Sequence, residues 1–251
     1  YSNSPISLQP TVAAYLPDGG FNDWSPFANA TTGGPIDLPN ARVALEKWNR
    51  VSSSLFTRIY IEVLPIKDLS IKSSVSVTNN SNQTIRFIPS SLATRAYNNS
   101  GAYALKGSSQ GENLLMENTV SFKKNISAHS VDAVYGFTLQ SKNNDSFNLG
   151  GSGYLVDYIG VNDLGSIPDK ESLIANSGYT EQNMMSHLAR INYNYDRRYY
   201  ITLSGRYDGA SNFAQNHKWA FFPSVALKWN ILKESFMKNN RVFNDLSLRL
   251  S

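Results

Sequence analysis

The sequence predicts an all-β chain: an antiparallel transmembrane β-barrel wall, built from about seven or eight strands of a larger barrel with long extracellular loops. Three observations predict this fold class. Several segments alternate strictly between apolar and polar residues, and the connections between them alternate between short and long. Charged residues make up only 17% of the chain while aromatic residues reach 12%. Such a sheet has one face that needs a non-aqueous neighbour and one face that needs water.

The clearest alternation lies in residues 184–230. Two alternating segments are joined by a turn at residues 196–198, and a period of two is that of a strand, whereas a helix has a period of 3.6. The mainly apolar side holds His187, Ala189, Ile191, Tyr193 and Tyr195 on the first strand, and Tyr199, Ile201, Leu203, Gly205 and Tyr207 on the second. The segment therefore predicts a β-hairpin with one apolar and one polar face.

Further alternating segments precede and follow this hairpin. They are residues 53–63, 69–77, 114–124, 131–139, 219–231 and 245–251. Short connections follow the first and third of these segments, while long polar stretches at 79–110 and 141–182 are expected to be loops. Long loops at one rim and tight turns at the other are typical of outer-membrane barrels. We therefore expect one barrel domain over 1–251, with 1–50 mainly loop and 51–251 strands and loops.

Composition excludes several classes of protein. The chain has no Cys, which rules out disulfides and thiolate metal sites, and its net charge of +4 is spread without a basic run that would bind nucleic acid. No stretch approaches the ~18 apolar residues of a membrane-spanning helix. His129, His187 and His217 lack metal-ligand spacing, so neither a metal nor a cofactor is expected.

Enzymatic signals are weak as well. Residues 107–111 read Gly-Ser-Ser-Gln-Gly and match the nucleophile-elbow pattern, but the strand and helix that make such a serine reactive are not indicated around it. The sequence therefore predicts a protein that is not an enzyme.

Particular runs of residues resemble the barrel of SusC/RagA-type TonB-dependent outer-membrane transporters. They are Ala189–Asp196 (ARINYNYD), Gly205–Phe213 (GRYDGASNF), Trp219–Trp229 (WAFFPSVALKW), Leu115–Phe122 (LMENTVSF), His129–Gly136 (HSVDAVYG) and Phe243–Ser251 (FNDLSLRLS). The resemblance covers most of the chain from about residue 53 and is strongest over 184–251.

The resemblance implies a function and a location. Such transporters import bulky nutrients, oligosaccharides or peptides, across the outer membrane of Bacteroidetes-like bacteria. TonB supplies energy through an N-terminal plug, and a SusD-like surface lipoprotein caps the barrel. No plug domain is found in this chain, so we expect it to be part of a longer receptor.

Two sets of residues are candidates for function. Charged residues on the polar face are expected to point into a water-filled lumen, where they form salt bridges and plug contacts or touch substrate: Arg58, Glu62, Arg190, Arg206 and Asp208. Aromatic residues in the expected loops are candidates for substrate binding or for anchoring loops to one another: Trp24, Trp48, Tyr97, Tyr103, Tyr154 and Tyr158. Gly209 is expected to supply turn geometry at the rim.

The alternative is a secreted, soluble β-sandwich module that binds carbohydrate, with Trp24 or Trp48 as its platform. Solvent exposure distinguishes the two folds, because a barrel exposes its apolar band and a sandwich buries it. The residues that decide are Ile59, Ile61, Ile191, Tyr193, Ile201, Leu203, Leu227 and Trp229.

Overall fold

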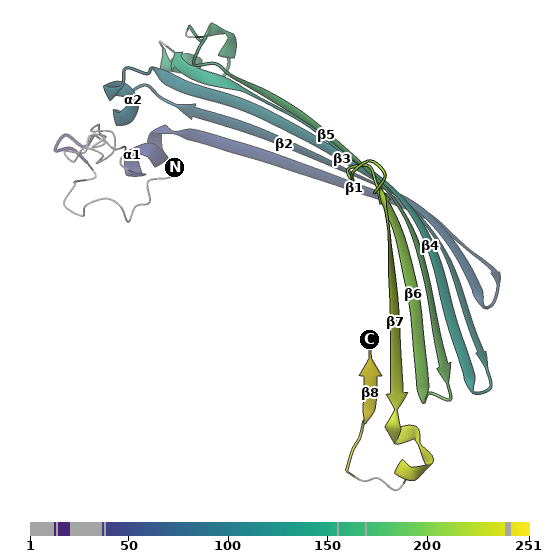
Figure 1. Cartoon of the computed structure of the whole chain (residues 1–251). Helices are drawn as coiled ribbons and strands as arrows, with labels where there is room; N and C mark the ends of the chain where they lie inside the picture. The colour runs from purple at the N-terminus through teal and green to yellow at the C-terminus, as the bar shows by residue number, and fades with distance from the viewer. Residues whose placement is uncertain are drawn as a thin grey trace. The chain divides into compact units, whose positions relative to one another are not determined.

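The computed structural model describes residues 13, 15–20, 37, 39–154, 156–168, 170–238 and 242–251. Within these residues eight strands form one sheet, in which neighbours in sequence are neighbours in space (Figure 1). The strands are β1 (Lys47–Ile66), β2 (Leu69–Ile88), β3 (Ala102–Ile126), β4 (His129–Tyr154), β5 (Ile174–Tyr195), β6 (Tyr199–Ala210), β7 (Trp219–Asn230) and β8 (Ser247–Leu250). The all-β, antiparallel prediction is confirmed.

The first five strands are longer than the sequence predicts. They have 20 to 26 residues, whereas β6 and β7 have 12. Most of the two stretches expected to be long loops is strand, because β2 continues to Ile88, β3 begins at Ala102, β4 continues to Tyr154 and β5 begins at Ile174. The loop prediction for these stretches was wrong: Ser, Asn, Gly and Thr on both faces remove the apolar alternation, but the backbone still pairs with its neighbours.

The tight turns are confirmed. Between β5 and β6, Asp196 and Arg197 have φ angles of 53° and 55°, and the N–H of Arg198 donates to the carbonyl of Tyr195 at 2.9 Å. Positive φ at both central residues matches the right-handed twist of the flanking strands. Residues at the end of β5 and the start of β6 are thereby paired directly, as in Tyr195 with Tyr199.

The chain divides into two compact units, which are described separately. Unit 1 comprises residues 1–53, 80–110 and 144–179. It includes the helices α1 (Pro39–Leu45) and α2 (Ala93–Tyr97) and the short helices η2 (Asp157–Ile159) and η3 (Leu164–Ser166). Its small core consists of Phe87, Ala102, Ala104, Tyr154, Leu164 and Ile167.

One glycine in unit 1 is required by its surroundings. Gly101 has a φ of +61°, and a Cβ at this position would lie 2.7 Å from the carbonyl oxygen of Tyr154. The left-handed backbone and the close approach of β4 both favour glycine here. This position connects α2 to the start of β3.

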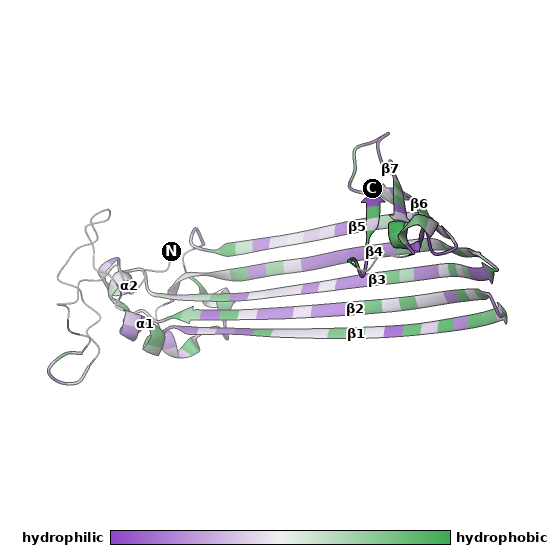
Figure 2. Ribbon diagram, turned by 90° about the horizontal axis from the view of Figure 1, so that it is seen from below, coloured by the Kyte–Doolittle hydropathy of each residue, from purple (hydrophilic) through white to green (hydrophobic). Residues whose placement is uncertain are grey.

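Unit 2 comprises residues 54–79, 111–143 and 180–251 and contains all the tight turns. Its sheet has two different faces, and green apolar bands recur along the parts of β1 and β2 that lead to their shared turn (Figure 2). On β2 the polar-face residue Ser74 is 4% exposed, whereas Val75 on the opposite face is 42% exposed. On β2 the polar-face side chains are thus the more closely packed ones.

The apolar face of unit 2 lies open. Of the eight residues that distinguish the two folds, Ile59, at 71%, is the most exposed. Tyr193 and Trp229 are half-buried, and their polar atoms bond to His129 and Glu234. The other six are exposed: Ile59, Ile61, Ile191, Ile201, Leu203 and Leu227. Within the described residues no second sheet covers this face, an arrangement that contradicts the β-sandwich alternative.

Among the described residues no helix has the length and the apolar character needed to cross a membrane.

Candidate functional site

The polar face of unit 2 has a connected set of side chains across β1, β2 and β3. The guanidinium of Arg58 donates to Ser74 Oγ at 3.0 Å and to the Glu117 carboxylate at 2.9 Å. Next to it, Ser70 Oγ donates to Glu62 Oε1 at 2.7 Å. Arg58 and Glu62 therefore lie on one face, as their spacing of four residues along a strand requires.

The same polar face continues over β4, β5 and β6. Thr202 Oγ1 donates to Asn192 Oδ1 at 2.9 Å, and Asn192 Nδ2 donates to Asp132 at 3.5 Å. Four residues further along β6, Arg206 pairs with Asp208 at 2.7 Å. All these groups remain partly accessible to water, as the polar lining of a channel would be.

Arg190 occupies a different environment on this face. It lies opposite Ser204 in the register of β5 and β6 and is exposed. Among the described residues neither a hydrogen bond nor an ion pair engages its side chain. Of the five charged residues expected in the lumen, Arg190 is thus the one without a polar partner among the described residues.

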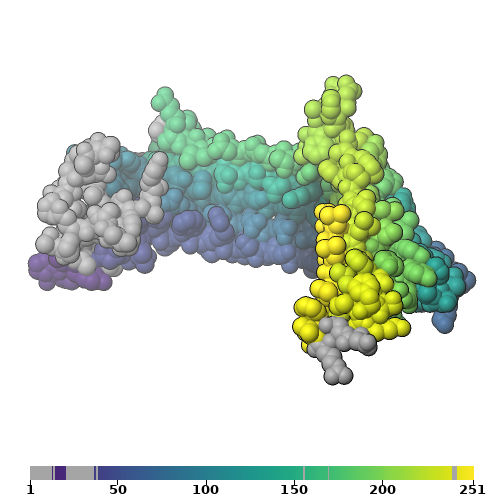
Figure 3. All heavy atoms as spheres, turned by 60° about the horizontal axis from the view of Figure 1, so that its bottom comes forward, coloured from purple at the N-terminus to yellow at the C-terminus, as the bar shows by residue number. Residues whose placement is uncertain are grey.

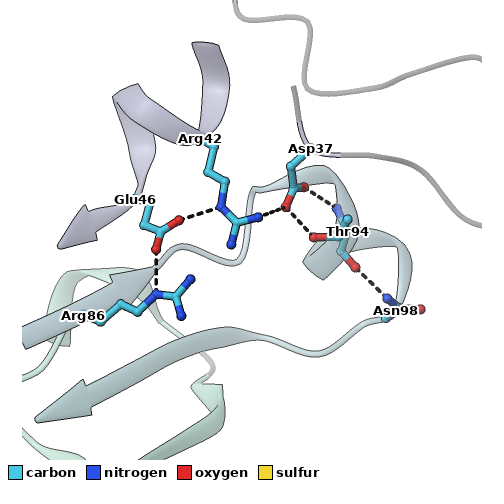
Figure 4. A network of polar contacts seen from close by, with 6 residues as sticks. All are labelled: Asp37, Arg42, Glu46, Arg86, Thr94 and Asn98. Carbon is cyan, nitrogen blue, oxygen red and sulfur yellow. Dashed lines mark hydrogen bonds and ion pairs between the residues drawn. The ribbon is translucent and has the colours of Figure 1, made fainter. Parts of the chain in front are cut away.

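Unit 1 contains a charged network that the sequence analysis missed (Figure 4). Glu46 accepts from Arg42 and from Arg86, each at 2.6 Å, and Arg42 lies 3.9 Å from Asp37. Asp37 in turn accepts from the backbone N–H and the hydroxyl of Thr94 at 2.9 and 2.7 Å, so it holds the start of α2. The network ties the segment before β1 to β2 and to α2.

The charges in this network are fixed by their neighbours. Burial by itself raises the pKa of Glu46, but the hydrogen bonds and positive charges of Arg42 and Arg86 outweigh burial and hold that pKa below its ordinary value. Glu46 is therefore ionised near neutral pH. The network could not be predicted from the sequence, because its residues fall in segments expected to be loop.

Two of the predicted aromatic residues meet at this network. The Arg86 guanidinium lies 5.5 Å from the ring centroid of Trp48 and 5.9 Å from that of Tyr103. Arg95 approaches the ring of Tyr103 as well, at 5.8 Å. These are cation–π distances. Trp48 remains 65% exposed, so most of its ring is available to another molecule.

A shallow polar depression of about 360 Å³ lies further along the same strands. Its lining includes Arg50, Ser52, Asn82, Thr84, Ser109 and Asn148. Arg50 and Ser52 lie two and four positions after Trp48 in β1, so they share its face of the strand. Asn82 and Thr84 lie four and two positions before Arg86 in β2 and share the face of Arg86 in the same way. Hydroxyls, amides and one guanidinium therefore lie beside the aromatic pair, without an apolar side chain among the residues that line the depression.

The remaining aromatic candidates are scattered. Tyr158 in η2 is 87% exposed, and Tyr97 in α2 is also exposed. Tyr154 differs from expectation: it is 2% exposed and lies in the core of unit 1, so its ring presents no surface to a ligand. The end of β4 lies under η3, and this burial could not be read from the alternation. Trp24 lies outside the described residues.

Three further expectations can be compared with the structure. Gly209 has an ordinary backbone within β6, and the ring of Trp219 covers it at 2.8 Å from where a Cβ would lie. The expectation of turn geometry there was wrong, because an aromatic ring on the neighbouring strand fills the position of the missing side chain. Ser109, in the nucleophile-elbow pattern, lies within β3 and donates to Asn144 at 2.9 Å, so the pattern has no strand–turn–helix around it.

Two of the three histidines, His129 and His187, pair with tyrosines. His187 Nδ1 is 2.8 Å from Tyr135 Oη, and His129 Nδ1 is 2.7 Å from Tyr193 Oη. Among the described residues no three or more His, Asp or Glu side chains group in a way that could hold a metal ion.

The fold and the two faces define the class of protein: one antiparallel sheet with an open apolar side and a hydrogen-bonded polar side is a segment of a β-barrel wall. Comparison with known proteins agrees. The chain is 30% identical to the TonB-dependent receptor P26 of Formosa agariphila over 252 aligned residues, which are 100% of this chain and 25% of that protein. It is 32% identical to the TonB-dependent receptor SusC of Bacteroides thetaiotaomicron over 132 residues, 52% of this chain and 12% of SusC.

Solved structures give the same fold. The RagAB peptide transporter superposes with a TM-score of 0.78 at 21% identity, over 92% of this chain and 25% of that chain. No protein-family model matches. The chain belongs to the TonB-dependent receptors of the SusC/RagA type and spans about a quarter of the length of the first relatives it matches.

Proposed function

We propose that this chain forms part of the barrel wall of a bacterial outer-membrane transporter, which imports bulky nutrients with energy supplied through TonB. The observation that carries the proposal is the pair of opposite faces in unit 2. The apolar face is open although water would disfavour it, and the polar face is hydrogen-bonded across the strands. Lipid outside and water inside satisfy both faces at once.

The strand lengths support a division of each wall strand into two parts. A tilted strand needs about 9–11 residues to cross the hydrocarbon layer. The strands β1 to β5 have 20 to 26 residues. Their portions in unit 2 carry the apolar alternation, whereas in unit 1 Asn, Ser, Gln and Thr take many positions on both faces. In outer-membrane barrels the longer connections are extracellular and the short turns periplasmic. We therefore assign unit 1, where a SusD-like lipoprotein would cap the barrel, to the extracellular rim and the tight turns to the periplasmic side.

The lining of unit 1 supports one substrate class. The exposed Trp48 ring offers a flat apolar surface, and the depression beside it is lined by hydroxyls, amides and one guanidinium. Sugar rings stack on aromatic faces and their hydroxyls pair with such groups, whereas the lining of the depression offers no apolar side chain to an aliphatic peptide side chain. These contacts favour an oligosaccharide over a peptide.

A first experiment tests the orientation of the wall. The chain contains no Cys. In the full-length receptor, a fluorophore is attached to V225C on the apolar face or to S224C on the polar face. Brominated acyl chains in the surrounding lipid should quench only the fluorophore at V225C. Absence of quenching at both positions is the result for a soluble module and would overturn the proposal.

A second experiment tests import. A strain that lacks the full-length receptor is grown on panels of oligosaccharides and peptides, with complementation in the presence and absence of functional TonB. Growth on one oligosaccharide should require both proteins, and W48A should reduce uptake more than W48F. Uptake that survives loss of TonB would contradict the mechanism, and uptake of peptides alone would contradict the substrate class.

A further inference from the structure

The tight-turn end of unit 2 is basic. Among the described residues of the turns and of the segment between β7 and β8 there are five basic side chains and four acidic ones, and two lysines near the end of β3 add to the positive charge. The basic ones are Lys67, Arg197, Arg198, Lys233 and Lys238, the two in β3 are Lys123 and Lys124, and the acidic ones are Asp68, Asp196, Glu234 and Asp245. Excess positive charge at one end of a barrel attracts negatively charged groups.

Much of the acidic charge is already paired. Lys124 bonds to Asp68, and Arg198 bonds to Asp196 at 2.7 Å and to Glu234 at 3.5 Å. Arg197 and Lys233 are exposed and form no ion pair with the described residues. The two cations lie on different elements, the turn between β5 and β6 and the helix η4 (Ile231–Lys233).

These two cations line one polar depression of about 500 Å³, together with Ser127, His129, Asn194 and Asp196. Asp196 is the single acidic group in its lining, and its carboxylate is engaged by Arg198. The Nδ1 atom of His129 is hydrogen-bonded to Tyr193 Oη. Its Nε2 atom has no hydrogen-bond partner among the described residues. Two cations, a free imidazole nitrogen, a hydroxyl and an amide suit a phosphate group.

Aromatic residues of the apolar side of the sheet are neighbours of His129 and Lys233, which line this depression. His129 packs on Tyr195 with ring centroids 5.0 Å apart. In the next strands Tyr199 Oη and Trp229 Nε1 both donate to Glu234, at 2.6 and 2.9 Å. Tyrosine and tryptophan with one polar end are enriched where a membrane meets water.

An apolar groove continues from these rings. In register, Tyr199 lies beside Trp229 and Leu248, and the next row on the same face is Ile201, Leu227 and Leu250. All six residues line the groove, and β8 lies beside the end of β7 (Figure 3). The groove has the chemistry of an acyl-chain site, and the basic depression has that of a headgroup site.

We propose that this corner of the wall binds one anionic phospholipid of the periplasmic leaflet, with its phosphate at Arg197 and Lys233 and an acyl chain along the apolar groove. The inference rests on the proposed membrane location and adds a specific lipid partner to it. Charge complementarity selects an anionic headgroup over a zwitterionic one.

The test uses the full-length receptor, delipidated in neutral detergent and titrated with phosphatidylglycerol or phosphatidylcholine, with bound lipid counted by native mass spectrometry. R197N and K233Q remove the charges, and Asn is chosen because it tolerates the positive φ at this turn. A basic residue near a lipid surface contributes about fivefold in affinity. The double variant should therefore lose about 25-fold for phosphatidylglycerol and little for phosphatidylcholine.

The matched control is K67Q, which removes a cation from another turn of the same end. Its phosphatidylglycerol affinity should change less than twofold. Equal losses in K67Q and the double variant would show diffuse attraction and overturn the site, as would equal binding of both lipids. Displacement of the lipid by millimolar glycerophosphate would identify a site for a free phosphate ester. Failure of the quenching experiment at V225C would overturn the membrane location itself.

Discussion

A lysine at Leu203 of β6 tests which face of the sheet meets lipid, and a lysine at the next residue, Ser204, is its control. Leu203 lies between Ile191 and Val225 in the register and is exposed on the apolar face. It is four residues beyond Tyr199, where β6 begins. At ~3.4 Å per residue and a tilt of ~40°, that places it roughly 10 Å inside a ~25 Å apolar band, close to the midplane.

The expected cost follows from this depth. A lysine near the bilayer midplane on the lipid face of a barrel costs about 2–4 kcal/mol, which lowers the folding equilibrium constant by a factor of roughly 30 to 1000. A lysine at Ser204 faces the polar side and should cost less than about 1 kcal/mol. Folding of the full-length receptor into lipid vesicles, followed as a function of urea, measures both. Equal costs at the two positions, or a larger cost at Ser204, would refute the assignment of the faces.

Three smaller perturbations address other parts of the wall. Hydrogen bonds from Tyr199 and Trp229 hold the pKa of Glu234 below its ordinary value, so its stabilising effect is present above about pH 4.3 and is lost as the pH falls through the lowered value. Urea midpoints of the wild type should fall in that acid range, and those of E234Q should fall less; parallel pH profiles would contradict this role. G101A places a Cβ 2.7 Å from a backbone oxygen at a φ of +61°, so melting temperatures should show a loss of stability beyond the about 1–2 kcal/mol that a left-handed backbone alone costs an alanine; an unchanged melting temperature would contradict the close approach of β4. R58A breaks a partly exposed ion pair with Glu117 and should cost no more than about 1 kcal/mol in urea unfolding; a loss of 3 kcal/mol or more would indicate a dry interior in place of a water-filled one.

The sequence predicted the parts of the fold that lie in unit 2. There the apolar alternation is strong, because one face is built for a non-aqueous neighbour, and the pairing of Met184–Tyr195 with Tyr199–Ala210 follows the predicted turn. The open apolar face and the grouping of Arg58 with Glu62 follow from the same period of two. Hydropathy thus identified the faces of the sheet.

Unit 1 could not be predicted in this way. The stretch Asn79–Ile88 reads as loop because Asn, Ser, Gln and Thr occupy both faces, yet it is the continuation of β2. The network around Glu46 joins residues about 40 positions apart in sequence, and its pairing depends on the register of β1 and β2. Trp48 and Tyr103, two of the six aromatic candidates, meet through Arg86, a residue for which the sequence offered no pattern.

These two outcomes have a common physical cause. Backbone pairing satisfies the N–H and C=O groups of a strand in water and in lipid alike, so it requires no particular side chains. Side-chain alternation is required only where the two faces meet different solvents. Along β2 the alternation of Val75 and Val77 gives way to Asn, Ser, Gln and Thr on both faces over residues 79–84, although the strand continues to Ile88. Under the proposed membrane location, such a loss of alternation is expected where the wall leaves the lipid.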